Sequence, residues 1–224
     1  MLRLIALAGL AMTVAGSPAA VAQGATFYTV TYVEVGPVLS KVGAAALKAY
    51  RDAARKDTGV VFFEAFQRID RPNQFAVLGA WTNQAAYDAH AAGENSKKFT
   101  EKLSSMLVAP SDTRLHNALS VGQVKPAKDP VFAITHVDVI PPQKDNGVAA
   151  LKELAEASRN HTANLAFDVA QQTNRPNHFT VVESWANRGA FDLHQMQKDT
   201  RDFRTKLGTM TGALYDERLY KPLK

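Results

Sequence analysis

Apolar and polar residues alternate where the chain's patterned part begins, and the spacing then becomes helical. Residues 27–35 alternate β-branched and aromatic side chains with others, which predicts a strand. Over residues 40–56 the apolar positions recur three or four apart, which predicts a helix that Gly59 ends. Gly36 and Pro37 lie between these two elements and stop the strand.

A hairpin and two further helical stretches complete the pattern. Residues 60–69 and 75–81 are predicted to pair, because the turn Asp70-Arg71-Pro72-Asn73 carries a proline that presets its dihedral and an asparagine that tolerates the left-handed region. Asn83 is placed to cap the next helix. A second helical stretch and a last strand follow, at residues 96–107 and 113–121.

This pattern occurs twice. Residues 70–90 align with residues 174–194 without a gap, so that Trp185 follows Trp81 by 104 positions (185 minus 81). A period of roughly 100 residues is that of a small domain rather than of a solenoid repeat. In the second copy the predicted elements cover residues 132–139, 144–161, 165–173, 178–185, a helix capped by Asn187, and 214–220.

Each copy therefore has the βαββαβ order of a ferredoxin-like α+β domain. We predict one domain at residues 25–121 and another at residues 131–224, joined by the polar, proline-containing linker 122–130. Helices on one face of a four-stranded sheet leave the other face bare. We expect the two sheets to pack face to face, as a pseudo-dimeric α+β barrel within one chain; further oligomerisation is left open.

The N-terminus has the pattern of a secretory signal peptide. Arg3 is followed by the mostly apolar residues 4–14, and Ala20-Val21-Ala22 is a small-residue cleavage site. We predict that residues 1–22 are removed and that the protein is periplasmic or secreted. No other stretch is long and apolar enough to span a bilayer, so no membrane partner is expected after cleavage.

Composition excludes several classes of function. The chain has no cysteine, which rules out disulfides, thiolate metal sites and thiol nucleophiles. The formal charge is +5, but acidic residues are interspersed and no nucleic-acid-reading motif is present, so no nucleic-acid partner is expected. Hydrolase, kinase and dinucleotide-binding motifs are absent too.

The residues around the hairpin point to a family. Trp81 ends a strand, Asn83 and Ala86 begin the next helix, His90 follows on that helix, and Phe99 lies downstream. The second copy repeats the set as Trp185, Asn187, Ala190, His194 and Phe203. This arrangement resembles the antibiotic biosynthesis monooxygenase (ABM) family, whose members resemble one another as dimeric α+β barrels. Two copies in one chain would then be a fused dimer.

The resemblance implies an activity as well as a fold. The family includes cofactor-independent oxygenases that act on quinols and polycyclic phenols, and haem-degrading enzymes that use an asparagine on the first strand. That strand carries Tyr32 and Glu34 in one copy and His136 and Asp138 in the other, so haem degradation is the weaker expectation. The quinol hypothesis requires no cofactor.

Four residues are candidates for acid–base chemistry. His90 and His194 could accept a proton from a phenol, since an imidazole titrates near neutral pH; alternatively they are structural residues that fix the helix to the hairpin. Tyr32 and His136 occupy equivalent positions on the first strands and could orient a substrate, although His136 could equally be an exposed strand residue.

A second group of residues could line a substrate pocket or belong to the core. These candidates share one face of the third strand of each copy: Phe75 and Trp81, then Phe179, Glu183 and Trp185. A strand-end tryptophan buries a large area, which favours the core. Glu183 replaces Gly79, and a carboxylate does not suit a dry helix–sheet interface. We therefore expect this face to look into a cavity between the sheets or to be partly wet.

The remaining histidines predict no metal site. His116, His161 and His178 lie on a strand, at a helix end and at a turn edge, without a partner at ligand spacing in the sequence. Two hypotheses of function remain. One is an exported, cofactor-independent monooxygenase for a quinol or phenol. The other is a non-catalytic binding or stress-response module that holds a small hydrophobic or aromatic molecule.

Overall fold

The computed structural model describes residues 25–224, so the predicted signal peptide, residues 1–22, lies outside the described part. The first half contains β1 (Phe27–Glu34), η1 (Pro37–Leu39), α1 (Ser40–Ala54), β2 (Val60–Arg68), β3 (Gln74–Trp81), α2 (Gln84–Ala92), α3 (Glu94–Ser104) and β4 (Asp112–Ser120). The second half contains β5 (Val131–Asp138), η2 (Pro141–Gln143), α4 (Lys144–Ser158), β6 (Asn164–Gln172), β7 (His178–Trp185), α5 (Arg188–Gln195), α6 (Lys198–Gly208) and β8 (Asp216–Pro222). These boundaries agree with the predicted ones to within three residues.

The predicted α+β fold of two ferredoxin-like units is confirmed, and the sheets join more closely than simple stacking requires. The strands form one closed antiparallel barrel in the order β1-β3-β2-β8-β5-β7-β6-β4. Each half keeps its own four-stranded sheet, in which β4 pairs with β1 and β8 pairs with β5. The outer edges of these last strands join the two sheets, because β4 also pairs with β6 and β8 also pairs with β2. This pairing between the halves leaves neither sheet with an open edge, where unpaired backbone groups would invite aggregation.

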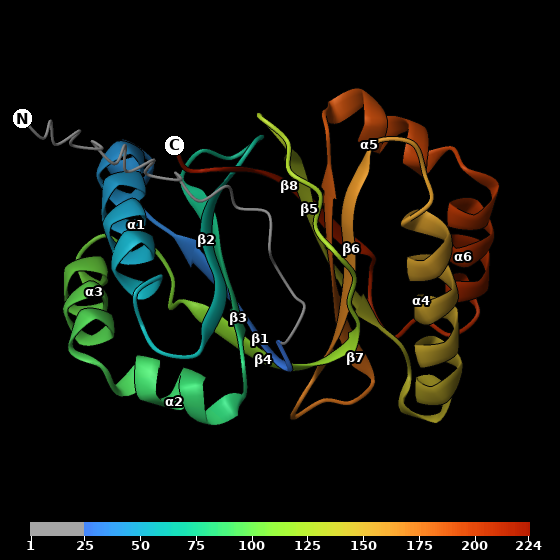
Figure 1. Cartoon of the computed structure of the whole chain (residues 1–224), viewed down its shortest axis with the longest axis horizontal. Coiled ribbons are helices and arrows are strands. Elements are labelled where there is room, and N and C mark those ends of the chain that lie inside the picture. The colour runs from blue at the N-terminus through green and yellow to red at the C-terminus, as the bar shows by residue number, and fades with distance from the viewer. Residues whose placement is uncertain (1–24) are drawn as a thin grey trace, which may run out of the picture.

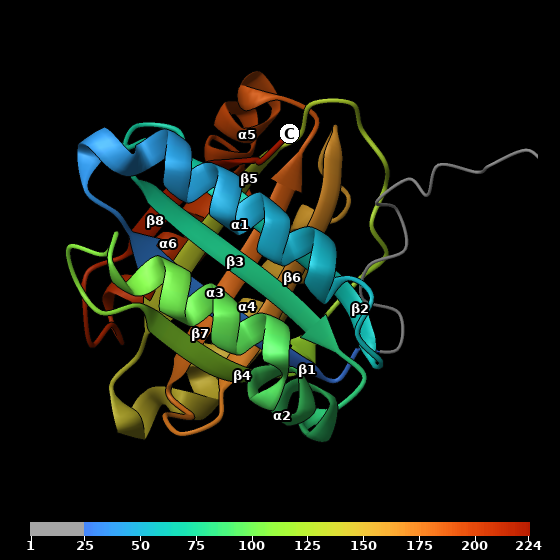
Figure 2. The same ribbon diagram turned by 90° about the vertical axis from the view of Figure 1, so that its left-hand side faces the viewer.

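The helices cover the outside of the barrel in two separate layers. Figure 1 shows α1–α3 on one side of the strands and α4–α6 on the other. In the turned view of Figure 2, α1 and α3 lie on the outside of the sheet with β3 visible between them. Among residues 25–224, no helix combines the length and apolarity needed to cross a lipid bilayer.

The side chains pack into three apolar clusters that follow from this layering. One cluster lies between α1–α3 and their sheet and includes Leu47, Phe75 and Trp81; its counterpart in the second half includes Phe179 and Trp185. The third cluster takes residues from both halves and fills the barrel: Tyr28, Val30, Phe66, Leu78, Ile134 and Tyr220. Alternation along each strand therefore sends one face to the helices and the other into the barrel.

Local signals predicted from the sequence are confirmed at the helix starts. The Asn83 side chain accepts a hydrogen bond from the backbone N–H of Ala86 at 2.9 Å, and Asn187 does the same for Ala190 at 3.0 Å. These caps satisfy N–H groups that the first helical turn leaves unpaired. They also fix where α2 and α5 begin, and so where the histidines on these helices point.

Ala163→Gly should stabilise the protein by about 0.5–1 kcal/mol. Ala163 has a φ of 61°, in the left-handed region that disfavours a side chain, whereas Gly59, at the equivalent position of the first half, has a φ of 82°. Relief of this strain should exceed the entropy that glycine adds to the unfolded chain. Urea unfolding followed by circular dichroism would measure the gain.

The control is the reverse change in the first half. In Gly59→Ala, the new Cβ would lie 2.5 Å from Cβ of Ala86 and 3.0 Å from Oγ1 of Thr82, so this variant should lose stability. An Ala163→Gly variant that is less stable than the wild type would show that the backbone at this turn is not strained.

Candidate functional site

The inside of the barrel changes character along its axis. Its middle is filled by apolar side chains from both halves, such as Phe66, Ile134 and Tyr220. Beyond one end, where β5 begins and β8 ends, lies a cavity of about 710 Å³. Towards the other end, where β5 ends and β8 begins, the inward positions carry histidines, arginines and aspartates. We call the cavity of about 710 Å³ the barrel-end cavity, and the opposite end, with its histidines, arginines and aspartates, the polar end of the barrel.

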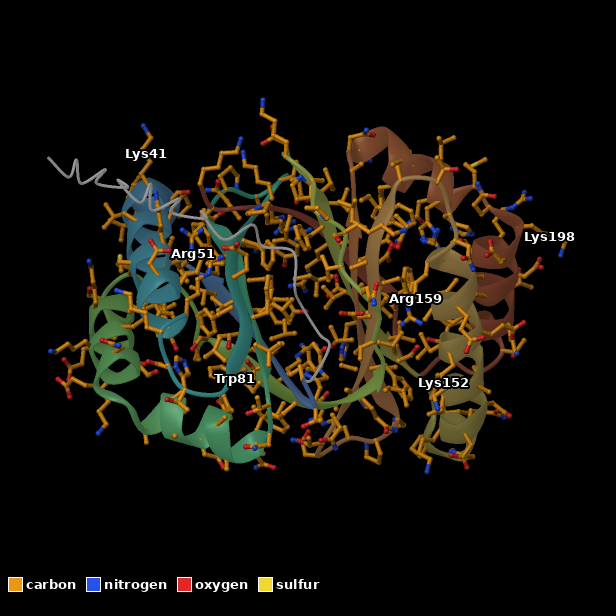
Figure 3. The ribbon with its side chains drawn as sticks, viewed as in Figure 1. Lys41, Arg51, Trp81, Lys152, Arg159 and Lys198 are labelled. Carbon is orange, nitrogen blue, oxygen red and sulfur yellow. The ribbon has the colours of Figure 1, made fainter. Side chains whose placement is uncertain are left out.

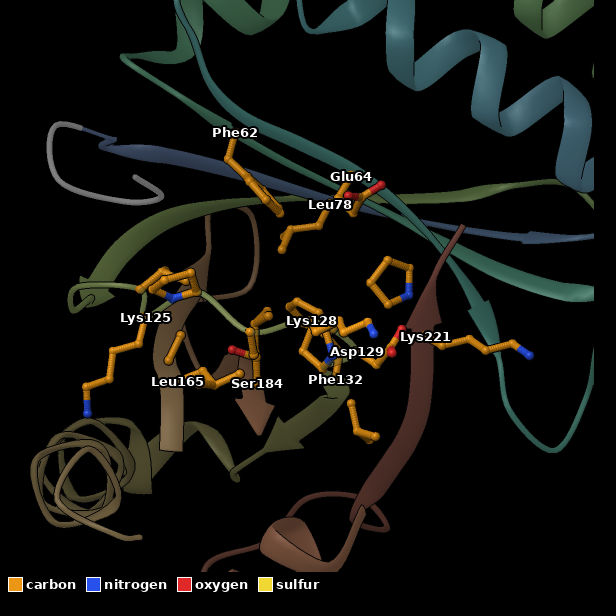
Figure 4. Close-up of a pocket in the computed structure, with 18 of the residues that line it drawn as sticks. Phe62, Glu64, Leu78, Lys125, Lys128, Asp129, Phe132, Leu165, Ser184 and Lys221 are labelled. Atoms are coloured by element: carbon orange, nitrogen blue, oxygen red, sulfur yellow. The ribbon is translucent and has the colours of Figure 1, made fainter. Parts of the chain in front are cut away.

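The barrel-end cavity has mostly apolar walls that both halves supply. Phe62 and Leu78 lie on one side, and Phe132, Leu165 and Ser184 lie on the other (Figure 4). Residues of the linker and of the C-terminal end also line it, namely residues 124–130 and 221–224. Its volume falls in the range of small-molecule sites, about 300–1,000 Å³, and apolar walls with few polar groups are typical of them.

Two carboxylates line the cavity from equivalent positions of the repeat. Glu64 on β2 forms ion pairs with Arg51 at 3.0 Å and with Arg55 at 2.8 Å, so its charge is compensated. Asp168 on β6, 104 residues later, keeps only one of these cations, because Arg159 replaces Arg55 while an alanine, Ala155, stands at the position of Arg51. Figure 3 marks Arg51 and Arg159 beside the two sheets.

Asp168 is the polar group of this cavity with the most perturbed acidity. Its side chain is buried, and burial raises its pKa to about 6, although the hydrogen bond from the Gly122 backbone N–H and the charge of Arg159 act in the other direction. Gly122 donates to Oδ1 at 2.9 Å, so the first residue of the linker is tied to this carboxylate. A buried carboxyl group with a pKa near neutrality in a cavity wall can exchange a proton with a bound molecule.

Tyr28 lies near this carboxylate on the inner face of the barrel. Its hydroxyl group is buried and has no hydrogen-bond partner within the described residues. Burial raises the pKa of Tyr28, and the charge of Asp168 adds to the shift, so the phenol stays protonated at neutral pH. Tyr28 can therefore act as a hydrogen-bond donor near Asp168, but it is not one of the residues that line the cavity.

His90 does not lie in this cavity but between α2 and the sheet. Its Nδ1 lies 2.7 Å from Oδ2 of Asp57, and its Nε2 lies 2.7 Å from the Tyr50 hydroxyl group. The ring packs against Trp81 with centroids 4.7 Å apart, and Phe63 lies on a further side. Both ring nitrogens are thus engaged within a filled layer, which favours the structural alternative for His90.

His194 occupies the equivalent place in the second half and belongs to a longer chain of polar groups. His161 Nε2 donates to Asp199 at 2.8 Å, and the Nδ1 atoms of His161 and His194 lie 2.9 Å apart. On its far side, His194 Nε2 lies 3.5 Å from Oε2 of Glu183, which also accepts a hydrogen bond from Trp185 Nε1 at 2.9 Å. This series of contacting polar side chains runs from the surface at Asp199 to the fully buried Glu183.

Burial sets the protonation states of Glu183 and His194. It raises the pKa of Glu183 to about 8, with the nearby charge of Glu217 as a further cause. Burial lowers the pKa of His194 to about 3, and the neighbouring His161 lowers it further. At neutral pH Glu183 is therefore largely protonated and His194 is neutral. A protonated Glu183 can point its O–H at His194 Nε2, while His194 Nδ1–H donates to His161.

The expectation that the face bearing Glu183 looks into a cavity between the sheets is wrong. Phe75, Trp81, Phe179 and Trp185 are all at most 1% exposed and lie in the helix–sheet clusters. Glu183, at 1% exposure, lies with them. The carboxyl group is tolerated in this dry layer because it is protonated and hydrogen-bonded, whereas the expectation had assumed a charged carboxylate.

Tyr32 and His136 lie on the other face of the sheet, inside the barrel. Tyr32 packs between the guanidinium groups of Arg114 and Arg218, each 5.2 Å from the ring centroid. His136 Nε2 lies 2.8 Å from Oδ1 of Asp138. The structure therefore brings Tyr32 and His136 to one end of the barrel but separates both from His90 and His194, so that these four side chains form no common site.

Ligand-type side chains converge in one place within residues 25–224. His136, Asp138 and His178 each offer one ligand atom, and these atoms lie within 4.8 Å of one another. The expectation that His178 has no partner at ligand spacing is wrong, because Asp138 on β5 pairs directly with His178 on β7. This trio lies at the polar end of the barrel, away from the barrel-end cavity.

The sequence matches one family over most of its length. The sequence model of the antibiotic biosynthesis monooxygenase family matches residues 30–102 and again residues 130–206. The chain belongs to the ABM family. The resemblance inferred from the two tryptophan–histidine sets is thereby confirmed, and each half is one ABM unit. Among curated protein sequences, none matches this chain.

Solved structures share the whole two-unit fold. A candidate monooxygenase from Fusobacterium nucleatum superposes with a TM-score of 0.79 at 15% identity, over 91% of this chain and 94% of that chain. A candidate monooxygenase from Lactobacillus acidophilus gives 0.73 at 13% identity, over 89% and 95%. An anthrone oxidase-like protein gives 0.71 at 13% identity, over 90% and 93%. At these identities the likeness establishes the fold alone.

Two groups of this ABM chain were missed by reasoning from the sequence. Asp168 could have been found, because the repeat places an acidic residue, Glu64 or Asp168, at the same position of an otherwise apolar strand in both copies. His178 could not, because its partners lie on β5, which is not next to β7 in the sequence. Only the register of these two strands brings the side chains together.

Proposed function

We propose that this ABM protein is an exported, cofactor-independent monooxygenase, and that its substrate is a phenol or quinol bound in the barrel-end cavity. Family membership supports the reaction type, and residues 1–22 support export. The observation that carries the choice of site is Asp168, a buried carboxyl group with a pKa of about 6 in the wall of a cavity of about 710 Å³. The apolar walls suit a flat aromatic molecule.

The proposed reaction uses the acidity of the substrate. Asp168 as the carboxylate accepts the proton of the phenol, or of the CH₂ group in its keto form, and the resulting anion gives electrons to dioxygen. Overall, CH₂ and O₂ become C=O and H₂O. The carbon loses four electrons and dioxygen gains four, so the reaction balances without another reductant.

Asp168→Asn should lower the rate of oxygen uptake by about 10²–10⁴-fold, because asparagine keeps the shape and the Gly122 hydrogen bond but cannot accept the proton. The measurement is oxygen consumption by the purified mature protein with a panel of hydroquinones, naphthols and anthrones. Over the pH range around 6, the wild-type rate should rise with pH as Asp168 loses its proton.

His194→Gln serves as the matched variant, because it removes the other candidate base in the helix–sheet layer. Loss of turnover in this variant, with Asp168→Asn unaffected, would place the base at His194 and overturn the role of Asp168. Both variants should first be shown to keep the wild-type circular dichroism spectrum.

A second function, ligand binding without turnover, is favoured by one specific observation. Both ring nitrogens of His90 are already hydrogen-bonded within the protein, so His90 is not available as a base. Asp168 is then the strongest candidate base, and a single carboxylate in an apolar cavity also suits a site that only binds a ligand. Native mass spectrometry of the protein as purified would detect a bound aromatic molecule. Binding of naphthols without any oxygen uptake across the panel would support this second function and contradict the first.

A further inference from the structure

His136, Asp138 and His178 meet on the inner face of the barrel at its polar end. Residues 136 and 138 lie two apart on β5 and so share a face, and Asp138 pairs with His178 of β7. Oδ1 of Asp138 lies 2.8 Å from Nε2 of His136 and 2.7 Å from Nδ1 of His178. All three side chains are between 14% and 18% exposed, so they are shielded without being sealed off.

These short contacts are not hydrogen bonds. Asp138 Oδ1 and His178 Nδ1 are buried atoms, and neither has a hydrogen-bond partner within the described residues. Their distance would allow a hydrogen bond, so it is the direction of the N–H bond that does not fit. Two imidazole nitrogens and a carboxylate oxygen that approach one another without sharing protons have the arrangement that a cation stabilises.

The spacing is close to that of a metal site. Two ligand atoms that each lie about 2.1 Å from one ion are separated by about 3.0–3.4 Å, depending on the coordination geometry. The two contacts at 2.7 and 2.8 Å would need to lengthen by about 0.2–0.7 Å, and the ligand atoms of the two histidines lie within 4.8 Å of each other. Two imidazoles and one carboxylate suit divalent transition metals, and three protein ligands leave further positions open.

Two arginines near the trio are each paired with an aspartate, which offsets their charge. Arg114 faces His136, but its guanidinium group is paired with Asp112 at 2.8 Å. Arg218 is paired with Asp216, which also lies near His136.

The first half supplies a natural comparison. At the positions of His136, Asp138 and His178 it carries Tyr32, Glu34 and Gln74, a set without an imidazole. Asn73 donates to Glu34 Oε1 at 3.3 Å, so that carboxylate has a partner of its own. The ligand set therefore belongs to the second half alone, and a chain with two homologous halves would hold one ion rather than two.

We propose that His136, Asp138 and His178 form a binding site for one divalent transition-metal ion, of which zinc and cobalt are representatives. The site joins β5 to β7 at the polar end of the barrel. It is separate from the barrel-end cavity and from Asp168, so it depends neither on the proposed oxidation nor on its substrate. An ion there would tie the end of β5 to the start of β7 and stabilise the second half.

The test is titration of the tag-free mature protein with Co²⁺, followed by the visible absorption of the bound ion, and competition by Zn²⁺ with a chromophoric chelator. The wild type should bind one ion per chain, and saturating Zn²⁺ should raise its Tm. His178→Gln installs the residue of the first half and should weaken binding by about 10²-fold or more, since even partners outside the ligand shell are worth about 10–100-fold. It should also abolish the shift in Tm.

Two more variants keep the result decisive. Asp138→Asn should lose binding as well, whereas His161→Gln removes a half-buried histidine outside the trio and should bind as the wild type does. A wild-type chain that takes up no Co²⁺ would overturn the proposal, and so would a His178→Gln variant that binds with unchanged affinity. If His178→Gln does not fold, Asp138→Asn and the Tm shift of the wild type give the same decision.

Discussion

Trp185→Ala should lower the free energy of unfolding by about 3–5 kcal/mol, at the upper end of single-residue effects. The side chain is 0% exposed and packs on His194 with ring centroids 4.5 Å apart. Its removal leaves a cavity in the helix–sheet layer and takes the Nε1–H donor from Glu183. Urea unfolding followed by circular dichroism at pH 6 would measure the loss.

Measuring ligand affinity as well as stability would show whether the two tryptophans belong to the core or to the substrate pocket. Neither Trp81 nor Trp185 lines the barrel-end cavity, so both alanine variants should bind a naphthol with an affinity within about twofold of the wild type. Trp81→Ala should cost a similar amount of stability, because Trp81 is also 0% exposed. A small loss of stability together with a tenfold loss of affinity for the naphthol would show that the tryptophans contact the ligand.

The repeat explains why so much of the fold could be predicted. Because the two halves align without a gap at a shift of 104 positions, each element predicted in one half can be compared with its equivalent in the other. Each half also leaves one sheet face uncovered by helices, and that face requires a partner. The closed barrel follows from the same reasoning. The pairing of β4 with β6 and of β8 with β2 across the two halves does not, because the pattern within a strand carries no information about which edge its neighbour occupies.

The side of the sheet on which each residue lies was harder to predict. A period of two separates the faces of β7 but does not say which face meets the helices. Glu183 indicated a wet face only because the carboxylate was taken as charged. In the structure its burial and the nearby charge of Glu217 raise its pKa and keep it protonated, so an acidic residue lies in the helix–sheet layer of the second half.

For the candidate site, too, the sequence predicted the positions of residues on their elements but not the contacts between distant elements. Tyr32 and His136 were correctly placed on one face, and His90 and His194 on equivalent helices. What joins residues into a site is contact between strands and linkers distant in the sequence. Asp168 becomes part of a cavity because the linker crosses the end of the barrel and Gly122 donates to it. Such contacts depend on register and loop path, which residue patterns do not encode directly.

Glu183→Gln should stabilise the protein at pH 8 by on the order of 2–4 kcal/mol and leave its stability nearly unchanged at pH 4.5. Glutamine keeps the shape of the side chain. Its carbonyl oxygen can accept the hydrogen bond from Trp185 Nε1, and its amide can donate to His194 Nε2, which a protonated Glu183 now faces. The variant therefore copies the neutral form of Glu183 and removes the cost of holding a proton on a group that is ionised in the unfolded chain.

The direction of the pH effect follows from the two pKa values. Glu183 has a pKa of about 8 in the folded protein against 4.5 in the unfolded chain, so its contribution to stability is complete below pH 4.5 and is lost as the pH rises to 8. His194 has a pKa of about 3 against 6.5, so its contribution is complete above pH 6.5 and is lost as the pH falls towards 3. Between pH 4.5 and 6.5 the two slopes cancel, and above pH 6.5 only the loss from Glu183 remains.

Urea unfolding of the wild type and of Glu183→Gln at half-unit steps from pH 4.5 to pH 8.5 would test this. The difference between the two proteins should grow by up to about 1.4 kcal/mol per pH unit between pH 4.5 and 8, where Glu183 is ionised in the unfolded wild-type chain but protonated in the folded one. Glu153→Gln makes the same change at an exposed glutamate outside the chain from Asp199 to Glu183, and should show no such dependence on pH. A difference that stays constant from pH 4.5 to pH 8.5 would mean that Glu183 has an ordinary pKa, and that its place in the helix–sheet layer is stabilised by a charge rather than by a proton.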